Sequence, residues 1–189
     1  MTLRAIEFIS ILSFHQNIVS SLIDEGLLGL IFPFFEYNIL SFKSKTDEYS
    51  LYENIIDVIF NLLVLLKDER LTRVLNRVSK PGFINSIFDY RNKIESRISA
   101  RIKNIENIES EDMLTLKVEE GLLVKYKISF ILTYYILSED NNPSNILPDK
   151  TENPLKTFDD MKNEAIELNS LIDNQNFKDV LIAINLINN

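Results

Sequence analysis

The sequence predicts an all-α protein, and three observations support this prediction. Apolar residues recur at steps of three and four along most of the chain, as one face of an amphipathic helix requires. No segment shows the regular alternation of apolar and polar residues that is typical of a half-buried strand. Only 4 of the 189 residues are glycine, which leaves little material for tight hairpin turns with a positive φ.

The composition is that of a globular chain, with 46% hydrophobic and 25% charged residues. Its length fits one domain, residues 1–189, with a sizeable core. The longest apolar runs, such as ISFILTYYIL at 128–137, fall short of the roughly 20 residues that span a bilayer. The N-terminal segment is interrupted by Glu7 and His15 and is a poor signal peptide. We therefore expect a cytoplasmic address, with the nucleus as an alternative.

Few residues of this chain suit catalysis or metal binding. The absence of cysteine excludes disulfides, thiolate metal sites and cysteine nucleophiles. The single histidine, His15, is expected in a surface turn between two helices, and nothing near it resembles a nucleophile elbow. No glycine-rich phosphate loop is present, and DNNPSNILPDKTE lacks the central glycine and final glutamate of a calcium loop. We expect no enzyme activity, no metal and no cofactor.

Three short helices are expected at the N-terminus. Apolar spacing defines the first around residues 3–9 and the second around 18–22. The third apolar stretch contains Pro33, which should kink the helix or restart it.

The next helix is expected to follow a polar loop at Ser41–Ser50. Ser50 and Glu53 have the spacing of a capping box, which should open a helix carrying Ile55–Leu66. The segment Ser79–Gly82, with its proline and glycine, is the next clear break.

The central part of the chain predicts two long helices. The first would span Gly82–Glu109, about 42 Å if unbroken, with a kink near Tyr90–Asn92 where apolar spacing lapses. The second would cover roughly Asp112–Leu137.

The C-terminal part begins with a surface loop at residues 138–154, which holds three prolines. Thr157 with Asp160 is expected to cap the following helix. Two final helices near Phe158–Ile172 and Asn176–Ile187 complete the chain.

Two segments of the chain read alike, GLLGLIF at 26–32 and GFINSIF at 82–88. A shift of 56 positions aligns the apolar positions of three successive helices without a gap and places Gly26 on Gly82. A weaker echo lies 72 positions further on, and mismatches include Phe35 against Arg91. Each expected unit consists of two short helices, a glycine and a longer apolar helix.

This arrangement resembles the armadillo or HEAT-like repeat over about residues 3–91, although such repeats have a period near 40 residues. The resemblance implies a right-handed α-solenoid of about two to three irregular repeats, with units at 1–40 and 51–110. A helical C-terminal part at 111–189, with a loop near 138–156, would follow. The resemblance also implies a binding surface rather than an active site. Because the end helices are apolar and uncapped, neighbouring repeats of a longer solenoid are a further expected partner.

Charge is unevenly distributed along the chain. Residues 67–103 carry a net charge of +6, whereas the whole chain carries −8 and the part after Ser110 carries −7. Arginine suits bidentate capture of carboxylates or phosphates. If the two basic helices pack as neighbours, their basic rows would form one surface. The predicted partner-binding residues are Arg70, Arg73, Arg77, Lys93, Arg97 and Arg101.

We therefore expect a non-catalytic interaction module or scaffold segment that binds an acidic segment of a protein partner through this basic helical surface. The rows could instead be solvated or pair with the acidic C-terminal half. A nucleic-acid partner is not expected, because the chain is acidic and the basic stretch lacks interleaved exposed aromatics. The alternative function is a compact helical-bundle regulator, similar to the Bcl-2-like proteins of large DNA viruses, with a partner helix in an apolar groove. The chain lacks that family's Asn-Trp-Gly-Arg segment.

Overall fold

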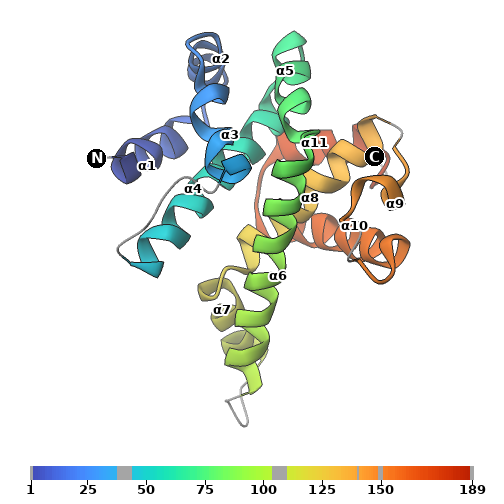
Figure 1. Cartoon of the computed structure of the whole chain (residues 1–189). Coiled ribbons are helices and arrows are strands. Elements are labelled where there is room, and N and C mark those ends of the chain that lie inside the picture. The colour runs from blue at the N-terminus through green and yellow to red at the C-terminus, as the bar shows by residue number, and fades with distance from the viewer. Residues whose placement is uncertain (1, 38–43, 104–109, 140, 149–150, 188–189) are drawn as a thin grey trace.

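The computed structural model describes residues 2–37, 44–103, 110–139, 141–148 and 151–187, and every regular element among them is an α-helix, as predicted. Helices α1 to α5 precede the long helix α6, and five further helices follow it (Figure 1). Their bounds are α1 Thr2–Leu12, α2 Gln16–Asp24, α3 Leu27–Tyr37, α4 Lys45–Leu65, α5 Glu69–Val78, α6 Pro81–Lys103, α7 Ser110–Glu119, α8 Leu122–Ser138, α9 Pro143–Ile146, α10 Pro154–Leu171 and α11 Gln175–Ala183.

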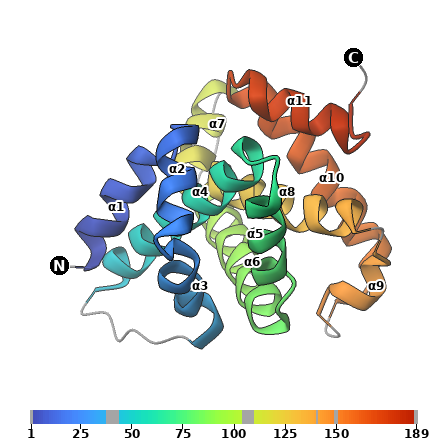
Figure 2. The same cartoon turned by 90° about the horizontal axis from the view of Figure 1, so that it is seen from above.

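Helices from the N-terminal and C-terminal parts of the chain lie on opposite sides of the molecule (Figures 1 and 2). Helices α1 to α3 lie on one side, α4 to α6 in the middle, and α9 to α11 on the other side in both views (Figures 1 and 2). Helix α1 packs on α4 and α4 packs on α8, while α3 packs on α6. Helix α8 also contacts α6 and α10, and this central position explains why most of its side chains are buried.

One continuous apolar core contains residues from the N-terminal, central and C-terminal helices. Within this core, three aromatic rings from different helices contact one another: Phe60 of α4, Phe130 of α8 and Phe177 of α11. The centroid of the Phe177 ring lies 5.1 Å from that of Phe60 and 4.8 Å from that of Phe130. Helix α11 therefore packs against both α4 and α8 where these two helices meet.

The expected capping box at Ser50 and Glu53 is wrong. Helix α4 begins at Lys45, and its N-cap is Ser44, whose side chain accepts a hydrogen bond from the backbone N–H of Thr46. Ser50 lies inside the helix, so the second part of the expected polar loop is helical. A serine side chain can cap a helix at either position, and the sequence pattern alone does not rank the two.

The two long central helices differ from their expected bounds. Helix α6 runs without a break through residues 90–92, and residues 104–109 of its expected C-terminal end lie outside the described residues. The second expected helix is divided into α7 and α8 by Gly121, which has a φ of +99°. The left-handed region favours glycine and ends a right-handed helix, which explains the division.

The paired glycines of the two similar segments have different conformations. Gly26 has a φ of +97° in the turn between α2 and α3. Gly82 lies in the first turn of α6, after Pro81. The expectation that both units enter their third helix through a glycine turn is therefore wrong for the second unit. Pro33 does not end α3, whose buried Phe32 and Phe35 pack against Phe83 of α6 on either side of the proline.

Asparagines, rather than the expected Thr157, cap the C-terminal helices. Asn153 accepts a hydrogen bond from the backbone of Lys156 and opens α10, while Asn174 caps α11 in the same way. The expected loop at 138–154 contains the short helix α9, capped by Asn142. Helix α11 is shorter than predicted: it ends at Ala183, and Asn185 beyond it has a φ of 57°.

His15 precedes α2 in an exposed turn, as predicted. Among the described residues no single helix has the length and apolarity of a membrane span; only α2 and α3, bent by 84°, pass that test as a pair.

Candidate partner-binding site

The six predicted binding residues lie on two consecutive helices, α5 and α6. Arg70, Arg73 and Arg77 follow α5, whereas Lys93, Arg97 and Arg101 follow the second half of α6. A helix rises about 1.5 Å per residue, so Arg97 lies about 24 Å along α6 from its start at Pro81. Although α5 and α6 are packed neighbours, the two rows contact different parts of the molecule.

The first α5 arginine is held by two carboxylates. The guanidinium of Arg70 lies 2.7 Å from Asp24 of α2 and 2.7 Å from Asp68, the N-cap of its own helix. The hydrogen bond from Arg70 holds the pKa of Asp24 below its usual value, and the backbone N–H of Arg70 does the same for the pKa of Asp68. Arg70 therefore fixes α2 against α5 at this corner.

Arg73 is oriented by the same neighbour but remains half exposed. Its guanidinium lies 3.3 Å from Asp24 and donates a hydrogen bond of 3.1 Å to the backbone carbonyl of Ile23. The side chain of Arg73 is 48% exposed. These contacts limit its rotamers and leave part of the guanidinium facing solvent.

A basic hollow of about 590 Å³ opens between α5 and the start of α3. Arg73, Asn76, Arg77 and Lys80 line one side, and the chain around Gly26–Gly29 lines the other. None of the described residues that line the hollow is acidic. Because i and i+4 residues share a helix face, Arg73 and Arg77 point in one direction, whereas Lys80 lies between α5 and α6. We call this feature the basic hollow.

On α6, Arg97 makes several contacts within the fold. Its guanidinium donates hydrogen bonds of 2.9 and 2.6 Å to the backbone carbonyl of Glu120, in the turn after α7. It also lies 3.8 Å from Glu53 and 4.7 Å from the centre of the Tyr49 ring. Burial raises the pKa of Glu53, and the charge of Arg97 partly offsets that effect. Arg97 therefore ties α4 and α6 to the turn before α8.

The other two predicted α6 residues lie at separate places. Arg101 is exposed and lies 3.8 Å from a carboxylate oxygen of Glu120. Lys93 is exposed beside a small hollow of about 170 Å³, which Phe35 and Tyr90 also line. The structure thus brings Arg73 and Arg77 together in the basic hollow, and it does not bring the α6 row to the same place.

Sequence reasoning missed a buried charged cluster between α6, α8 and α10. Arg91 of α6 donates hydrogen bonds of 2.7 Å to both carboxylate oxygens of Glu164 and one of 2.8 Å to Ser129. Lys125 lies 2.8 Å from Glu164 and also contacts Glu95. The only available signal was the repeat mismatch, because buried Arg91 occupies the position that Phe35 has in the first unit.

Glu164 is ionised in this cluster. Burial alone would raise the pKa of Glu164, but the charge of Arg91 and hydrogen bonds from Arg91, Lys125 and Ser129 lower it below its usual value. Nearby, Tyr126 donates a 2.5 Å hydrogen bond to Glu167, and burial followed by this bond raises the pKa of the tyrosine. A carboxylate held by two cations suits the joining of three helices better than proton transfer.

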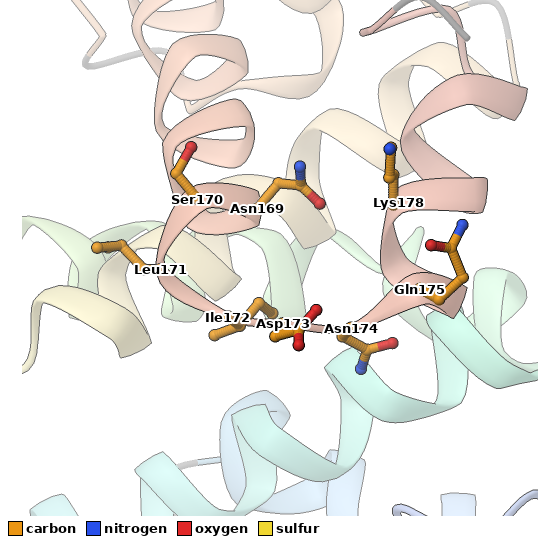
Figure 3. A pocket seen from close by; sticks show the side chains of 8 residues that line it. All are labelled: Asn169, Ser170, Leu171, Ile172, Asp173, Asn174, Gln175 and Lys178. Carbon is orange, nitrogen blue, oxygen red and sulfur yellow. The ribbon is translucent and has the colours of Figure 1, made fainter.

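A second polar hollow, of about 420 Å³, lies at the corner between α10 and α11. Figure 3 shows Asn169 at the end of α10 and Lys178 on α11, with Asp173 and Asn174 in the turn between them. Asn174 serves as the cap of α11, and Gln175 donates a hydrogen bond to Asp179 one turn later. The polar groups of this corner end one helix and begin the next, so we do not assign it a ligand.

Across the described residues no group of three or more His, Cys, Asp or Glu side chains could hold a metal ion. No protein-family model, curated protein or solved structure matches the chain. The basic hollow is therefore assigned from its own geometry and charge.

Proposed function

We propose that this protein is a non-catalytic interaction module whose basic hollow binds an acidic segment of a protein partner. One observation supports the proposal most directly: Arg73, Arg77 and Lys80 line an open hollow with no acidic residue among the described residues of its lining. Such a cluster attracts carboxylates, and the arginines offer paired N–H donors to them. The acidic charge of the whole chain would limit binding to segments that reach into the hollow.

The helix contacts support the armadillo-like stack that the sequence suggested. In that stack α1, α4 and α8 are the first helices of three successive units, and α3, α6 and α10 are the third helices. The packing of α1 on α4, of α4 on α8 and of α3 on α6 fits this order. The basic hollow then lies where the first unit meets the second, between α3 and α5. Junctions between neighbouring units are natural binding surfaces in such stacks.

The proposal is tested by capture of partners from a native lysate on immobilised protein, with identification by mass spectrometry. The informative variant is Arg77→Glu with Lys80→Glu, which reverses the charge of the hollow. Arg97 is unsuitable for this purpose, because its contacts with Glu120 and Glu53 hold the fold. The matched control is Lys156→Glu with Lys178→Glu, which changes the net charge equally at exposed sites on α10 and α11.

A partner that the wild type and the control variant capture, and the hollow variant does not, is the expected result. Circular dichroism should give the same helix content for all three proteins. Equal capture by all three would contradict the proposal. The exposed apolar side chains of Phe8 and Ile11 on α1, with Phe14 in the turn that follows, would then be the better candidate surface.

A further inference from the structure

Helix α1 buries a partly polar side against the rest of the fold. It lies at the outer edge of the molecule and packs on α4, which is itself packed on α8 (Figures 1 and 2). The buried side carries Ile6 but also two serines, Ser10 and, directly after the helix, Ser13. The hydroxyl of Ser13 accepts a hydrogen bond of 2.7 Å from the buried side chain of Asn61 on α4.

The outward side of α1 is more apolar than the inward side. Phe8 and Ile11 on α1 and Phe14 in the turn that follows are 61%, 62% and 59% exposed. Single exposed apolar residues are common on protein surfaces, whereas a contiguous group of large ones marks an interaction site. These three recur at steps of three residues, so they lie on one side of the helix. We call them the α1 patch.

The charged surroundings of the α1 patch argue against a lipid surface as its occupant. Glu7 lies four residues before Ile11, and the exposed His15 lies four residues after it. Arg4 is the only basic residue in the sequence of α1. Helices that lie on membranes carry several lysines or arginines beside their apolar side, and this chain has a net charge of −8.

The α1 patch is complementary to a second copy of itself. If two copies packed antiparallel about a two-fold axis beside Ile11, Phe8 of one copy would lie level with Phe14 of the other, because both are three residues from Ile11. Glu7 of one copy would lie level with His15 of the other, and each contact would occur twice, as in an isologous interface. A parallel pairing would bring the two Glu7 side chains together, which like-charge repulsion disfavours.

We infer that the α1 patch is a self-association surface, which joins two copies of this chain through antiparallel α1 helices. An aromatic side chain presents about 150–250 Å², so the exposed parts of the patch provide about 300–400 Å² of apolar area per copy. The total of about 600–800 Å² is less than the roughly 1,200–2,000 Å² of a stable interface. The dimer is therefore weak, with a Kd of about 10–100 μM. The patch contains no residue of the basic hollow, so this inference does not depend on the proposed function.

Sedimentation velocity of the full chain over a range of concentrations around the expected Kd tests the inference. We expect the wild type to convert from monomer to dimer as its concentration rises. Ile11→Glu places two carboxylates beside the axis and should weaken the dimer at least about tenfold. Leu155→Glu is the matched control, because Leu155 is 59% exposed at the start of α10, and it should leave the dimer unchanged. Circular dichroism checks that both variants fold.

Single cysteines show which residues meet, because the chain has no cysteine of its own. Ile11→Cys should form a disulfide-linked dimer on mild oxidation, since a residue beside a two-fold axis meets its own copy at the roughly 4.4–6.8 Å Cα separation that a disulfide requires. Leu155→Cys should remain monomeric under the same conditions. Glu7→Lys should weaken the dimer, and Glu7→Lys combined with His15→Glu should restore it, because the pair then attracts again across the axis.

The remaining outcomes would overturn the inference. A wild type that stays monomeric at every concentration, or a dimer that Ile11→Glu leaves intact, would show that the α1 patch does not join two copies. Equal cross-linking of Ile11→Cys and Leu155→Cys would show random collision. A monomer that floats with phosphatidylcholine vesicles, and loses this binding in Ile11→Glu, would assign the patch to a lipid surface instead. Failure of the double variant to restore the dimer would overturn the antiparallel arrangement.

Discussion

Glu164 is the residue on which the junction of α6, α8 and α10 depends. Its side chain is 13% exposed and forms ion pairs with Arg91 and Lys125, whose side chains are 9% and 11% exposed. Burying three charged groups costs free energy, which the fold offsets by pairing them. Removal of the carboxylate leaves two buried cations without their main partner.

We predict that Glu164→Gln lowers the free energy of unfolding by about 3–5 kcal/mol at pH 7, as expected when one member of a buried ion pair is removed. Urea denaturation followed by circular dichroism measures this change. Glu167→Gln is the matched control, because Glu167 is exposed and, within the part of the chain that the structure describes, accepts a side-chain hydrogen bond from Tyr126 alone. We expect the control to cost about 1 kcal/mol or less.

The stability difference between the wild type and Glu164→Gln depends on pH because the pKa of Glu164 is lowered in the folded protein. The pKa of this carboxyl is lower in the folded than in the unfolded protein, where a glutamate titrates near about 4.3. Its stabilising effect is complete above that pH and is lost as the pH falls through the lower pKa of the folded state. The wild type and Glu164→Gln should therefore converge in stability below about pH 4. A stability difference that stays constant from neutral to acidic pH would contradict this account.

At the scale of the element, two glycines differ in backbone conformation and in the space around them. Gly121 has a φ of +99°, and a Cβ atom there would lie 2.6 Å from the Nη2 atom of Arg97. Gly29 lies within α3 and has open space around its Cα atom. The two positions thus form a natural pair for comparing the same substitution.

We predict opposite effects of alanine at these glycines. Gly121→Ala should lower the free energy of unfolding by about 1–2 kcal/mol, because alanine is strained at a positive φ. Gly29→Ala should raise it by up to about 0.5–1 kcal/mol, because alanine has the higher helix propensity and Gly29 lies in the first turn of α3. Thermal melts of both variants measure these effects, and a stable Gly121→Ala protein would show that the α7–α8 turn is not constrained as described.

Helix α11 is expected to stabilise the C-terminal side of the stack. Phe177 is fully buried against Phe60 and Phe130. Phe177→Ala should cost about 3–5 kcal/mol through lost burial and a cavity. Lys178→Ala, at the next and exposed position, should change stability by no more than about 0.5 kcal/mol. Similar denaturation midpoints for the two variants would mean that the packing of α11 on α4 and α8 does not contribute to stability.

Sequence periodicity predicted the helices better than their ends. The i, i+3 and i+4 spacing indicated a helix in each long segment, because burial of one face determines that spacing. The ends depend on single local hydrogen bonds, and the chain offers competing caps, such as Ser44 and Ser50 for α4. Gly121 could have been recognised as a break, but apolar spacing on both sides of it concealed the turn.

The binding residues were predictable as basic rows but not as a site. Helical spacing correctly placed Arg73 and Arg77 on one face. It could not show that the Arg97 guanidinium donates hydrogen bonds to the backbone carbonyl of Glu120, since that contact joins residues far apart in the sequence. The contribution of Gly26 and Gly29 to the hollow also depends on how α3 packs beside α5, which a one-dimensional pattern does not contain.

At the scale of the whole molecule, an acidic chain carries a localised basic hollow. The net charge is −8, so the field beyond the hollow opposes an acidic partner, and attraction acts only at short range. We predict that capture of the partner falls as sodium chloride rises from about 0.05 to 0.5 M, because salt screens this attraction. Capture that does not change with salt would indicate an apolar interface.

The most direct test of the central claim is a nuclear magnetic resonance titration of protein labelled with ¹⁵N only at glycine. The chain has 4 glycines, so the spectrum is simple, and Gly26 and Gly29 line the basic hollow whereas Gly121 lies in the α7–α8 turn. The account predicts that an acidic peptide, a serine flanked on both sides by glutamates, shifts the Gly26 and Gly29 signals and leaves that of Gly121 in place. A peptide that binds and leaves the Gly26 and Gly29 signals unchanged would contradict it.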